Sequence, residues 1–309
     1  MREHLADPAR IHHEWDADLE PSVRINSRDS VHFKLKAAGE GQVWPGASFS
    51  ETQFDFDTIY NLCGPVHVSG AQIGDMLEIE ILELRAGDWA WAAFLPGMGL
   101  LAEDFPNGYV KTFDLTQGST TNFCPGIDIP ITPFLGTMGN HPGTPGRQVP
   151  FPPHRGGGNM DNRHLTAGTV LWLPVFVDGG MFSCGDPHAA QGDGEVCVTA
   201  IECPMEASLR FTLHKGVTGP PAFMVPSTSV SRKDAGGYYA TMGIKSDLME
   251  GAKSATRAMI QWLGMTHGLT PEDAYILCSA TCDLRIIEVV DAGMWNVAMT
   301  LPLSVFTKS

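Results

Sequence analysis

The segment GDPHAAQGDGE, residues 185–195, concentrates side chains that could do chemistry: Asp186, His188, Gln191, Asp193 and Glu195. It lies between the apolar run LWLPVFV and the strand-like stretch VCVTAI, so we expect it to form a loop. A turn needs only glycine, proline or small polar residues, and this segment carries much more. Residues two apart in an extended chain face the same side. We therefore expect Asp186 and His188 to share a pocket, and Asp193 and Glu195 to share one as well.

A second polar stretch, GGGNMDNRH, places Asn159, Asp161 and His164 directly after three glycines. Glycines tolerate positive φ and close backbone approach, so they could present Asn159 and Asp161 to a cleft. Carboxylate oxygens and imidazole nitrogens bind divalent metal ions, and an activated water needs a neighbouring carboxylate. The alternative is that these residues have no functional role: Asp193-Gly194 would form an ordinary turn, and Glu195 would be the solvent-facing start of the next strand.

Composition excludes several classes of partner. The 309 residues include 35 acidic and 20 basic side chains, a formal net charge of −15. Nucleic acids and anionic membranes need a basic face, so we expect neither as a partner. The N-terminal residues MREHLADPARIHHEW lack the apolar core of an export signal, and no stretch approaches the roughly 20 apolar residues that span a bilayer. A cytoplasmic protein is expected.

Several catalytic signatures are also missing from the sequence. The seven cysteines form no C-x-x-C pair, which argues against a redox motif or a four-cysteine zinc site. The chain has no G-x-S-x-G, H-E-x-x-H or P-loop motif. These absences leave the two polar stretches as the candidate site, and no organic cofactor is expected.

The elements that must position these residues are mostly short strands. With 34 glycines and 22 prolines, turns are frequent, and alternation predicts strands over 23–35, 75–84, 196–203, 208–213, 284–290 and 295–303. The stretch 125–164 is rich in proline and glycine and is predicted to be a long functional loop.

Two helices are predicted near the C-terminal end. Over 246–264, one amphipathic face is formed by apolar residues at helical spacing, namely Leu248, Ala252, Ala255, Met259 and Trp262. A second helix begins after Thr270 as N-cap, with Pro271 first and Asp273 three positions after the cap. The fold class is α+β and mainly β. We expect a large β-sandwich or barrel-like body (1–215) that carries the catalytic loops, and a smaller α/β part (216–309) packed on it. One compact unit is the alternative.

At this point a family resemblance becomes visible. The stretch GGGNMDNRHLTAGTVLWLPVFVDGGMFSCGDPHAAQGDGEVCVTAIE resembles the acetamidase/formamidase family, in which G-N-M-D leads to L-P-V and then G-D-x-H-A-x-Q-G-D-G-E. IHHEWDADLEP, LCGPVHVSGAQIGDMLEIEILEL, FLPGMGLLAEDFP, TPFLGTMGN, YYATMGI and LTPEDAYILCSATCDLRIIEVVD also fit, so the resemblance covers nearly the whole chain. Two departures are Pro187, where a smaller residue is usual, and the insert 140–155.

The resemblance implies hydrolysis of a short-chain amide, such as formamide or acetamide, to a carboxylate and ammonia. It also implies a β-rich fold with a smaller α/β part and a homodimer or larger homo-oligomer. A divalent metal ion, zinc first and calcium second, is implied as cofactor. The family's motif positions are occupied by Asn159, Asp161, Asp186, His188, Gln191, Asp193 and Glu195.

On this basis each residue receives a hypothetical role. Amide hydrolysis needs a positioned water, stabilisation of the oxyanion and a proton for the departing ammonia. Asp161, Asp186 and His188 would hold the metal or the water. Glu195 would be the general base, with Asp193 and His188 as further catalytic groups. Substrate contacts are expected from Asn159, Gln191 and His12.

Three alternatives stay open. Cys184 could act as a thiol nucleophile paired with His188. The altered insert 140–155 could adapt the same fold to a larger or cyclic amide, or to an amidine. The acidic segment could instead hold a structural ion in a non-catalytic protein. A pocket touched by both GNMD and GDPHAAQGDGE would favour the enzyme over the last of these.

Overall fold

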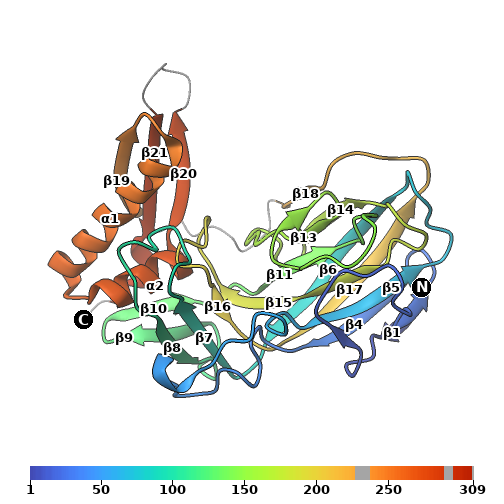
Figure 1. Cartoon of the computed structure of the whole chain (residues 1–309), viewed down its shortest axis with the longest axis horizontal. Helices are drawn as coiled ribbons and strands as arrows, with labels where there is room; N and C mark the ends of the chain where they lie inside the picture. Colours follow the sequence, from blue (N-terminus) through green and yellow to red (C-terminus); the bar gives the residue numbers. More distant parts are fainter. Residues whose placement is uncertain (227–236, 289–294, 308–309) are drawn as a thin grey trace.

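Two long strands with alternating apolar and polar residues form the centre of the body. Figure 1 shows the computed structural model, which describes residues 1–226, 237–288 and 295–307. β6 (Met76–Ala86) and β17 (Met205–His214) pair antiparallel and place Ile79 opposite Phe211. Both side chains are buried, and charged residues occupy the alternate positions. The strands predicted at these two places are confirmed.

These strands belong to the first of two sheets in the body. Its order is β1 (Glu3–Leu5), β4 (Ser30–Leu35), β17, β6, β14 (Val170–Pro174) and β18 (Ala222–Met224). The outermost strand β18 follows residue 215, the expected end of the body, yet it pairs with β14.

The second sheet has ten strands and carries the candidate site. Its main path is β12 (Pro153–His154), β13 (Gly157–Asn159), β11 (Phe134–Gly139), β15 (Phe182–Ala190), β16 (Ile201–Glu202), β7 (Trp89–Phe94) and β8 (Tyr109–Asp114). β5 (Leu62–Val68) also pairs with β15, and β2 (Ile11–His12) and β3 (Val23–Ile25) pair with β5. The remaining elements of the body are a hairpin of β9 (Thr120–Cys124) and β10 (Ile127–Pro130) and a 3₁₀ turn, η1 (Phe49–Glu51).

The two sheets pack face to face through aromatic side chains. The ring of Phe182 on β15 lies 5.0 Å from that of Phe211 and 6.5 Å from that of Phe33 on the other sheet. All three rings are fully buried. The expected β-sandwich body is therefore confirmed, and β15 lies in its core.

The C-terminal part contains the two predicted helices. A sheet of β19 (Tyr238–Lys245), β21 (Trp295–Pro302) and β20 (Asp283–Glu288) stands beside the body, with α1 (Leu248–His267) along one face (Figure 1). α2 (Pro271–Thr281) lies at the foot of this sheet, and a 3₁₀ turn, η3 (Leu303–Val305), follows β21. Thr270 caps α2 by accepting a hydrogen bond from the backbone N–H of Asp273. Both helices are confirmed, while residues 289 and 290 of the strand predicted over 284–290 fall outside the described residues.

The sequence misplaced three segments near the site. The predicted loop 125–164 contains four strands, and residues 185–190 of the predicted loop 185–195 lie in β15. Glycines in β11 are packing sites: a Cβ on Gly139 would lie 2.6 Å from the backbone nitrogen of Gly158. The predicted strand 196–203 keeps only Ile201–Glu202, because the preceding backbone bonds to α2 instead, as when Cys197 N–H donates to Ser279.

Among the described residues, no helix is long and apolar enough to cross a membrane.

Candidate active site

Neighbouring strands of the second sheet bring an imidazole and four carboxylates together. His188 on β15 lies opposite Phe134 of β11 on one side and Glu202 of β16 on the other. Asp186 precedes His188 on β15, Asp161 follows β13, and Glu195 comes from the loop after β15. We call Asp161, Asp186, His188, Glu195 and Glu202 the acidic cluster.

His188 is the centre of the acidic cluster. Its Nε2 lies 3.4 Å from Asp186 Oδ1 and 3.2 Å from Glu202 Oε2. Within the described residues, ligand atoms of Asp161, Asp186 and His188 lie within 4.8 Å of one another, and so do those of His188, Glu195 and Glu202. Asp186 and His188 thus face one site, as their spacing suggested.

The close approach of these side chains requires a residue without a side chain at position 136. A Cβ on Gly136 of β11 would lie 2.7 Å from Asp161 Oδ1, 2.8 Å from Asp186 Oδ2 and 2.8 Å from His188 Cε1. The backbone is also unusual, because Asp161, Asp186 and Glu195 all have positive φ values of 41–53°. Non-glycine residues rarely adopt this conformation, and it recurs at functional sites.

Gln191 orients the imidazole. Its carboxamide NH₂ donates to the backbone carbonyl of Asp161 at 2.8 Å, which turns its oxygen toward His188 Nδ1 at 3.0 Å. A carbonyl oxygen can only accept, so Nδ1 carries the proton. The other nitrogen, Nε2, therefore faces Asp186 and Glu202. A second partner of this kind is typical of histidines that bind metal ions.

Asn159 is held by three side chains at the edge of the cluster. Its NH₂ group donates to Asp161 Oδ2 at 2.9 Å and to the Tyr60 hydroxyl at 3.2 Å. Its oxygen accepts from the hydroxyl of Thr137 on β11. The GNMD segment is therefore locked against β11 and the Tyr60 loop.

Burial and mutual repulsion raise the pKa values of three carboxyl groups of the cluster. Burial raises the pKa of Asp161 and of Asp186, and their carboxylate neighbours raise it further. Burial and Asp161 likewise raise the pKa of Glu195 well above its ordinary value. Burial lowers the pKa of His188, but Glu202 and Asp186 outweigh it, and the net shift is well upward. Four carboxylates this close need protons or a cation between them.

The donor atoms fit a divalent cation. Among the described residues, Asp161 Oδ1, His188 Nε2 and Glu202 Oε2 are buried and have no hydrogen-bond partner. Buried polar atoms are normally satisfied, and carboxylate oxygens with an imidazole nitrogen are suitable ligands for zinc. The cluster could therefore hold a metal ion.

A small cavity opens onto the acidic cluster. Its volume is about 60 Å³, and its floor contains Asp186, Glu195 and Glu202. Its walls are mainly apolar, formed by Ala38, Phe56, Ile59, Tyr60, Trp91, Leu95, Met98, Phe151 and Val198. Of the two polar sequence stretches, only 185–195 lines this cavity, through Asp186 and Glu195. The GNMD segment reaches it indirectly, because Asn159 donates to the lining residue Tyr60 and Asp161 accepts from Gln191.

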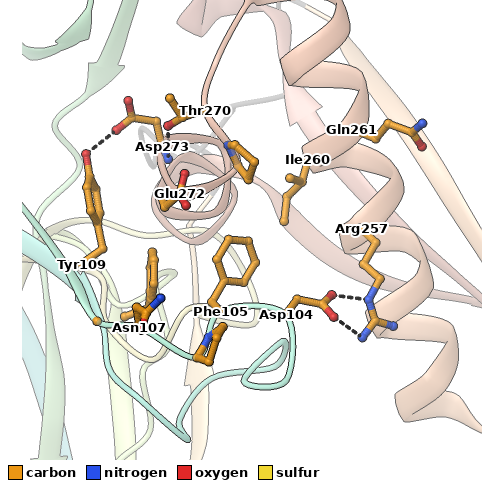
Figure 2. Close-up of a pocket in the computed structure, with 14 residues that line it drawn as sticks. Asp104, Phe105, Asn107, Tyr109, Arg257, Ile260, Gln261, Thr270, Glu272 and Asp273 are labelled. Atoms are coloured by element: carbon orange, nitrogen blue, oxygen red, sulfur yellow. Dashed lines mark hydrogen bonds and ion pairs between the residues drawn. The ribbon is translucent and has the colours of Figure 1, made fainter.

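A second cavity is larger but contains none of the cluster residues. It has a volume of about 770 Å³ and lies between the 104–109 loop and the two helices (Figure 2). Its charged side chains are largely paired with each other: Arg257 binds Asp104, and Asp273 binds Tyr109 and Lys111. The small cavity is therefore the candidate active site.

Three residues expected at the site lie elsewhere. Asp193 turns to Arg163 and His164 at 3.2 and 3.3 Å, because the chain between it and Glu195 is a turn with positive φ at Gly194 rather than an extended strand. His12 donates to or accepts from the Ser183 hydroxyl and does not line the cavity. Cys184 lies in the hydrophobic core, where burial raises the pKa of its thiol well above the ordinary value.

Three residues of the site were not predicted from the sequence: Glu202, Tyr60 and Gly136. Glu202 gave one signal, a single acid in the otherwise apolar run VCVTAIEC. Tyr60 lies in a connection with little regular structure, and burial together with Asp186 raises its pKa well above the ordinary value. Local sequence gave no signal for Gly136, whose role depends on side chains from β15 and from the segment after β13.

Comparisons with known proteins identify the family and its fold. The family model described as "Acetamidase/Formamidase family" matches residues 1–149 and 143–308. The acetamidase of Mycolicibacterium smegmatis is 26% identical, with 92% of this chain and 88% of that protein aligned. The solved structure of an acetamidase from Bacillus halodurans is 28% identical and superposes with a TM-score of 0.68 over 98% of each chain. A gamma lactamase from Delftia acidovorans, 24% identical, shares the fold with a TM-score of 0.90, over 98% of this chain and 91% of its own.

Proposed function

The chain belongs to the acetamidase/formamidase family, and on that premise we propose that it is an amidase that hydrolyses short-chain amides to a carboxylate and ammonia. The observation that carries the proposal is the acidic cluster, three of whose carboxylates, Asp186, Glu195 and Glu202, line a small and mainly apolar cavity. Zinc as the ion, a homo-oligomeric state and a cytoplasmic location stay predictions of the resemblance and the sequence.

The cavity favours a small, uncharged substrate. A volume of about 60 Å³ suits a molecule of a few heavy atoms. Within the described residues, its lining has three carboxylates and no lysine or arginine. An amide with an anionic acyl group would be repelled, and so would the carboxylate product, which would favour its release.

Asp161, Asp186 and His188 would hold the metal ion, with Glu202 beside the same imidazole nitrogen, Nε2, as Asp186. When bound, the ion would supply Lewis-acid polarisation of the amide carbonyl. Gln191 keeps the imidazole in the correct orientation for this by fixing the proton on Nδ1. This role replaces the substrate contact expected of Gln191, because both ends of its carboxamide already bind the protein.

Glu195 is the proposed general base. Burial and Asp161 raise its pKa, so the ionised carboxylate is a stronger base than an exposed one and can take a proton from water and return it. Water adds to the carbonyl carbon and loses a proton to Glu195. The C–N bond then breaks as Glu195 gives that proton to the nitrogen, and the products are the acid and ammonia.

Tyr60 is the proposed donor to the substrate oxygen. Its hydroxyl borders the cavity and accepts a hydrogen bond from the Asn159 NH₂ group. The hydroxyl proton is therefore left to donate to a substrate in the cavity. Its raised pKa keeps that proton in place at neutral pH. Asn159 thus supports the substrate through Tyr60.

The alternative substrate, a larger or cyclic amide, is suggested by the insert 140–155, and this insert does reach the cavity. Phe151, from the unusual insert 140–155, forms part of the cavity wall and packs against Tyr60, with ring centroids 4.8 Å apart. The insert therefore contributes to the size of the cavity.

Ammonia release from a panel of amides tests the proposal. Purified protein would be assayed with formamide, acetamide, propionamide, succinamate and a lactam, before and after chelation and with zinc or calcium added back. We expect release from the small neutral amides, its loss on chelation and its return with zinc. Hydrolysis of the lactam opens the ring and releases no ammonia, so it would be followed by the amino acid that forms. Hydrolysis of the lactam alone would favour the alternative. No release from any amide with either metal present would overturn the proposal.

Two variants in the same assay separate the mechanisms. Glu195→Gln should lower kcat by about 10²–10⁴-fold, while Cys184→Ser should keep near-normal activity because the thiol lies in the core. A Cys184→Ser variant that folds but is inactive would favour the thiol nucleophile.

A further inference from the structure

We propose that Arg163 and Asp283 are positioning residues, which fix the distance between the two segments that carry Asp161 and Glu195. The proposal rests on the proposed function, since it assigns these two residues to the same reaction. Arg163 follows Asp161 by two positions, and Asp283 comes from β20 in the C-terminal part.

Arg163 connects three segments. Its Nη2 lies 2.6 Å from Asp283 Oδ2, and its Nε lies 3.2 Å from Asp193 Oδ1. The side chains of Arg163 and Asp283 are 7% and 1% exposed, so this ion pair is shielded from solvent. Through it, the segment after β13 is tied to the loop of Glu195.

Asp283 also binds the backbone of the loop that carries Glu195. Its Oδ1 accepts from the backbone N–H of Asp193 at 3.1 Å. The backbones are also joined, because Leu284 N–H donates to the carbonyl of Asp193 and Gly192 N–H to the carbonyl of Ser279. The loop that carries Glu195 is therefore bound along its length to the junction of α2 and β20.

Energetics favours a geometric role for the ion pair. Burying two charges costs desolvation that their attraction often only offsets, so such pairs add little net stability. Asp161 and Glu195, however, both have positive φ, and residues in this conformation keep it only when surrounding contacts restrain them. The Arg163–Asp283 pair supplies such a restraint to both segments.

Neither residue takes part in the chemistry directly. Arg163 and Asp283 are absent from the cavity lining and from the two candidate groups of ligand atoms. Their effect must pass through Asp161 and Glu195. A displacement of about 1 Å at reacting groups can cost about 10²-fold in rate, so a loss of this size is expected when the restraint is removed.

A paired substitution tests the role without leaving a buried charge. Arg163→Met combined with Asp283→Leu replaces the pair by apolar groups, a change that buried ion pairs often tolerate. We expect an unfolding temperature near that of the wild type, a fall in kcat of about 10–10²-fold and a KM within about threefold. Calorimetric titration of the metal-free protein with zinc alone should show about tenfold weaker binding, because Asp161 is displaced.

A matched control shows whether loss of any ion pair between the C-terminal part and the body would have the same effect. Arg257→Gln removes another ion pair between this part and the body, the one to Asp104 (Figure 2), and both residues line the larger cavity rather than the one at the acidic cluster. It should change neither kcat nor the zinc affinity. An equal loss in Arg257→Gln, or unchanged kcat and zinc affinity in the folded double variant, would overturn the proposal.

A conservative single variant, Arg163→Lys, tests the proposal if the double variant does not fold. Arg163→Lys can bind one carboxylate but not bridge two, so it should retain an intermediate kcat and zinc affinity; wild-type values for both would contradict the proposal. A wild-type protein inactive on every amide would refute the proposed function, while the zinc titrations would still report on positioning.

Discussion

At the scale of single residues, Gly136 sets how closely the acidic cluster can assemble. It is the residue of β11 that faces Asp186 and His188 across the ladder, where a Cβ would collide with both and with Asp161. Its φ is not positive, so the requirement for glycine is one of space and not of backbone conformation. The site thus depends on the absence of a Cβ atom at residue 136.

Gly136→Ala should therefore lower catalytic activity strongly and stability only moderately. Overpacking of this kind costs about 1–3 kcal/mol of stability, whereas displaced ligand and base groups should lower kcat/KM by at least about 10²-fold. Gly219→Ala is the control, since a Cβ there would meet only Met76 at 3.5 Å. Steady-state kinetics and thermal unfolding of both variants check this, and an active Gly136→Ala variant would contradict the packing argument.

At the scale of elements, Asp75 fixes the start of β6 against the end of β17. Its carboxylate accepts from Lys215 at 2.7 Å and from the backbone N–H groups of Gly216 and Gln72 at 2.8 Å each. Burial raises the pKa of Asp75, but these hydrogen bonds outweigh it and the net pKa is lowered. Asp75 therefore stabilises the central strand pair only while it is ionised.

The stability of the protein should depend on pH through Asp75. A carboxyl whose pKa is lowered on folding contributes its full stability above its unfolded pKa, near 3.8, and loses it as the pH falls through the lower folded value. Asp75→Asn should lower the free energy of unfolding by about 1–3 kcal/mol at pH 7, with a smaller difference below pH 4. Denaturant unfolding across pH 2–7 measures this, with the exposed Asp178→Asn as control. A difference that does not shrink in acid would contradict it.

At the scale of the whole molecule, the C-terminal part is built into the body through α2. Residues 274–281 of α2 are all buried. The Tyr275 hydroxyl contacts the backbone of Leu101 and Val196, and the Ser279 hydroxyl donates to the carbonyl of Thr199. The loop that carries Glu195 is therefore supported from outside the body, so the two parts act as one unit at the site.

A fragment of residues 1–226, which retains β18, should not fold to a functional body. Removing α2 would expose the apolar surface it covers and leave the backbone of 192–199 without its partners, which is costly for buried polar groups. We expect protease sensitivity in this loop and loss of zinc binding, measured by limited proteolysis and calorimetry. A compact fragment with native zinc affinity would show that the body is independent.

Local sequence determined the elements whose signals lie within a few residues of each other. Alternation of Leu77, Ile79 and Ile81 was sufficient for β6, and Thr270, Pro271 and Asp273 were sufficient for the start of α2. The motif around Asp186 and His188 pointed to the family and to amide chemistry. These inferences succeed because periodicity, capping and short motifs depend on near neighbours along the chain.

Only the tertiary structure decided which of these side chains meet. The register of β15 against β11 and β16 brought Gly136 and Glu202 to His188, and the turn at Gly194 sent Asp193 to Arg163 instead. Residues 134–139, within the Pro/Gly-rich stretch 125–164, form a buried strand whose two glycines stand where close packing excludes side chains. Strand register joins residues far apart along the chain, such as Phe134 and His188, and neither propensity nor local pattern contains that information.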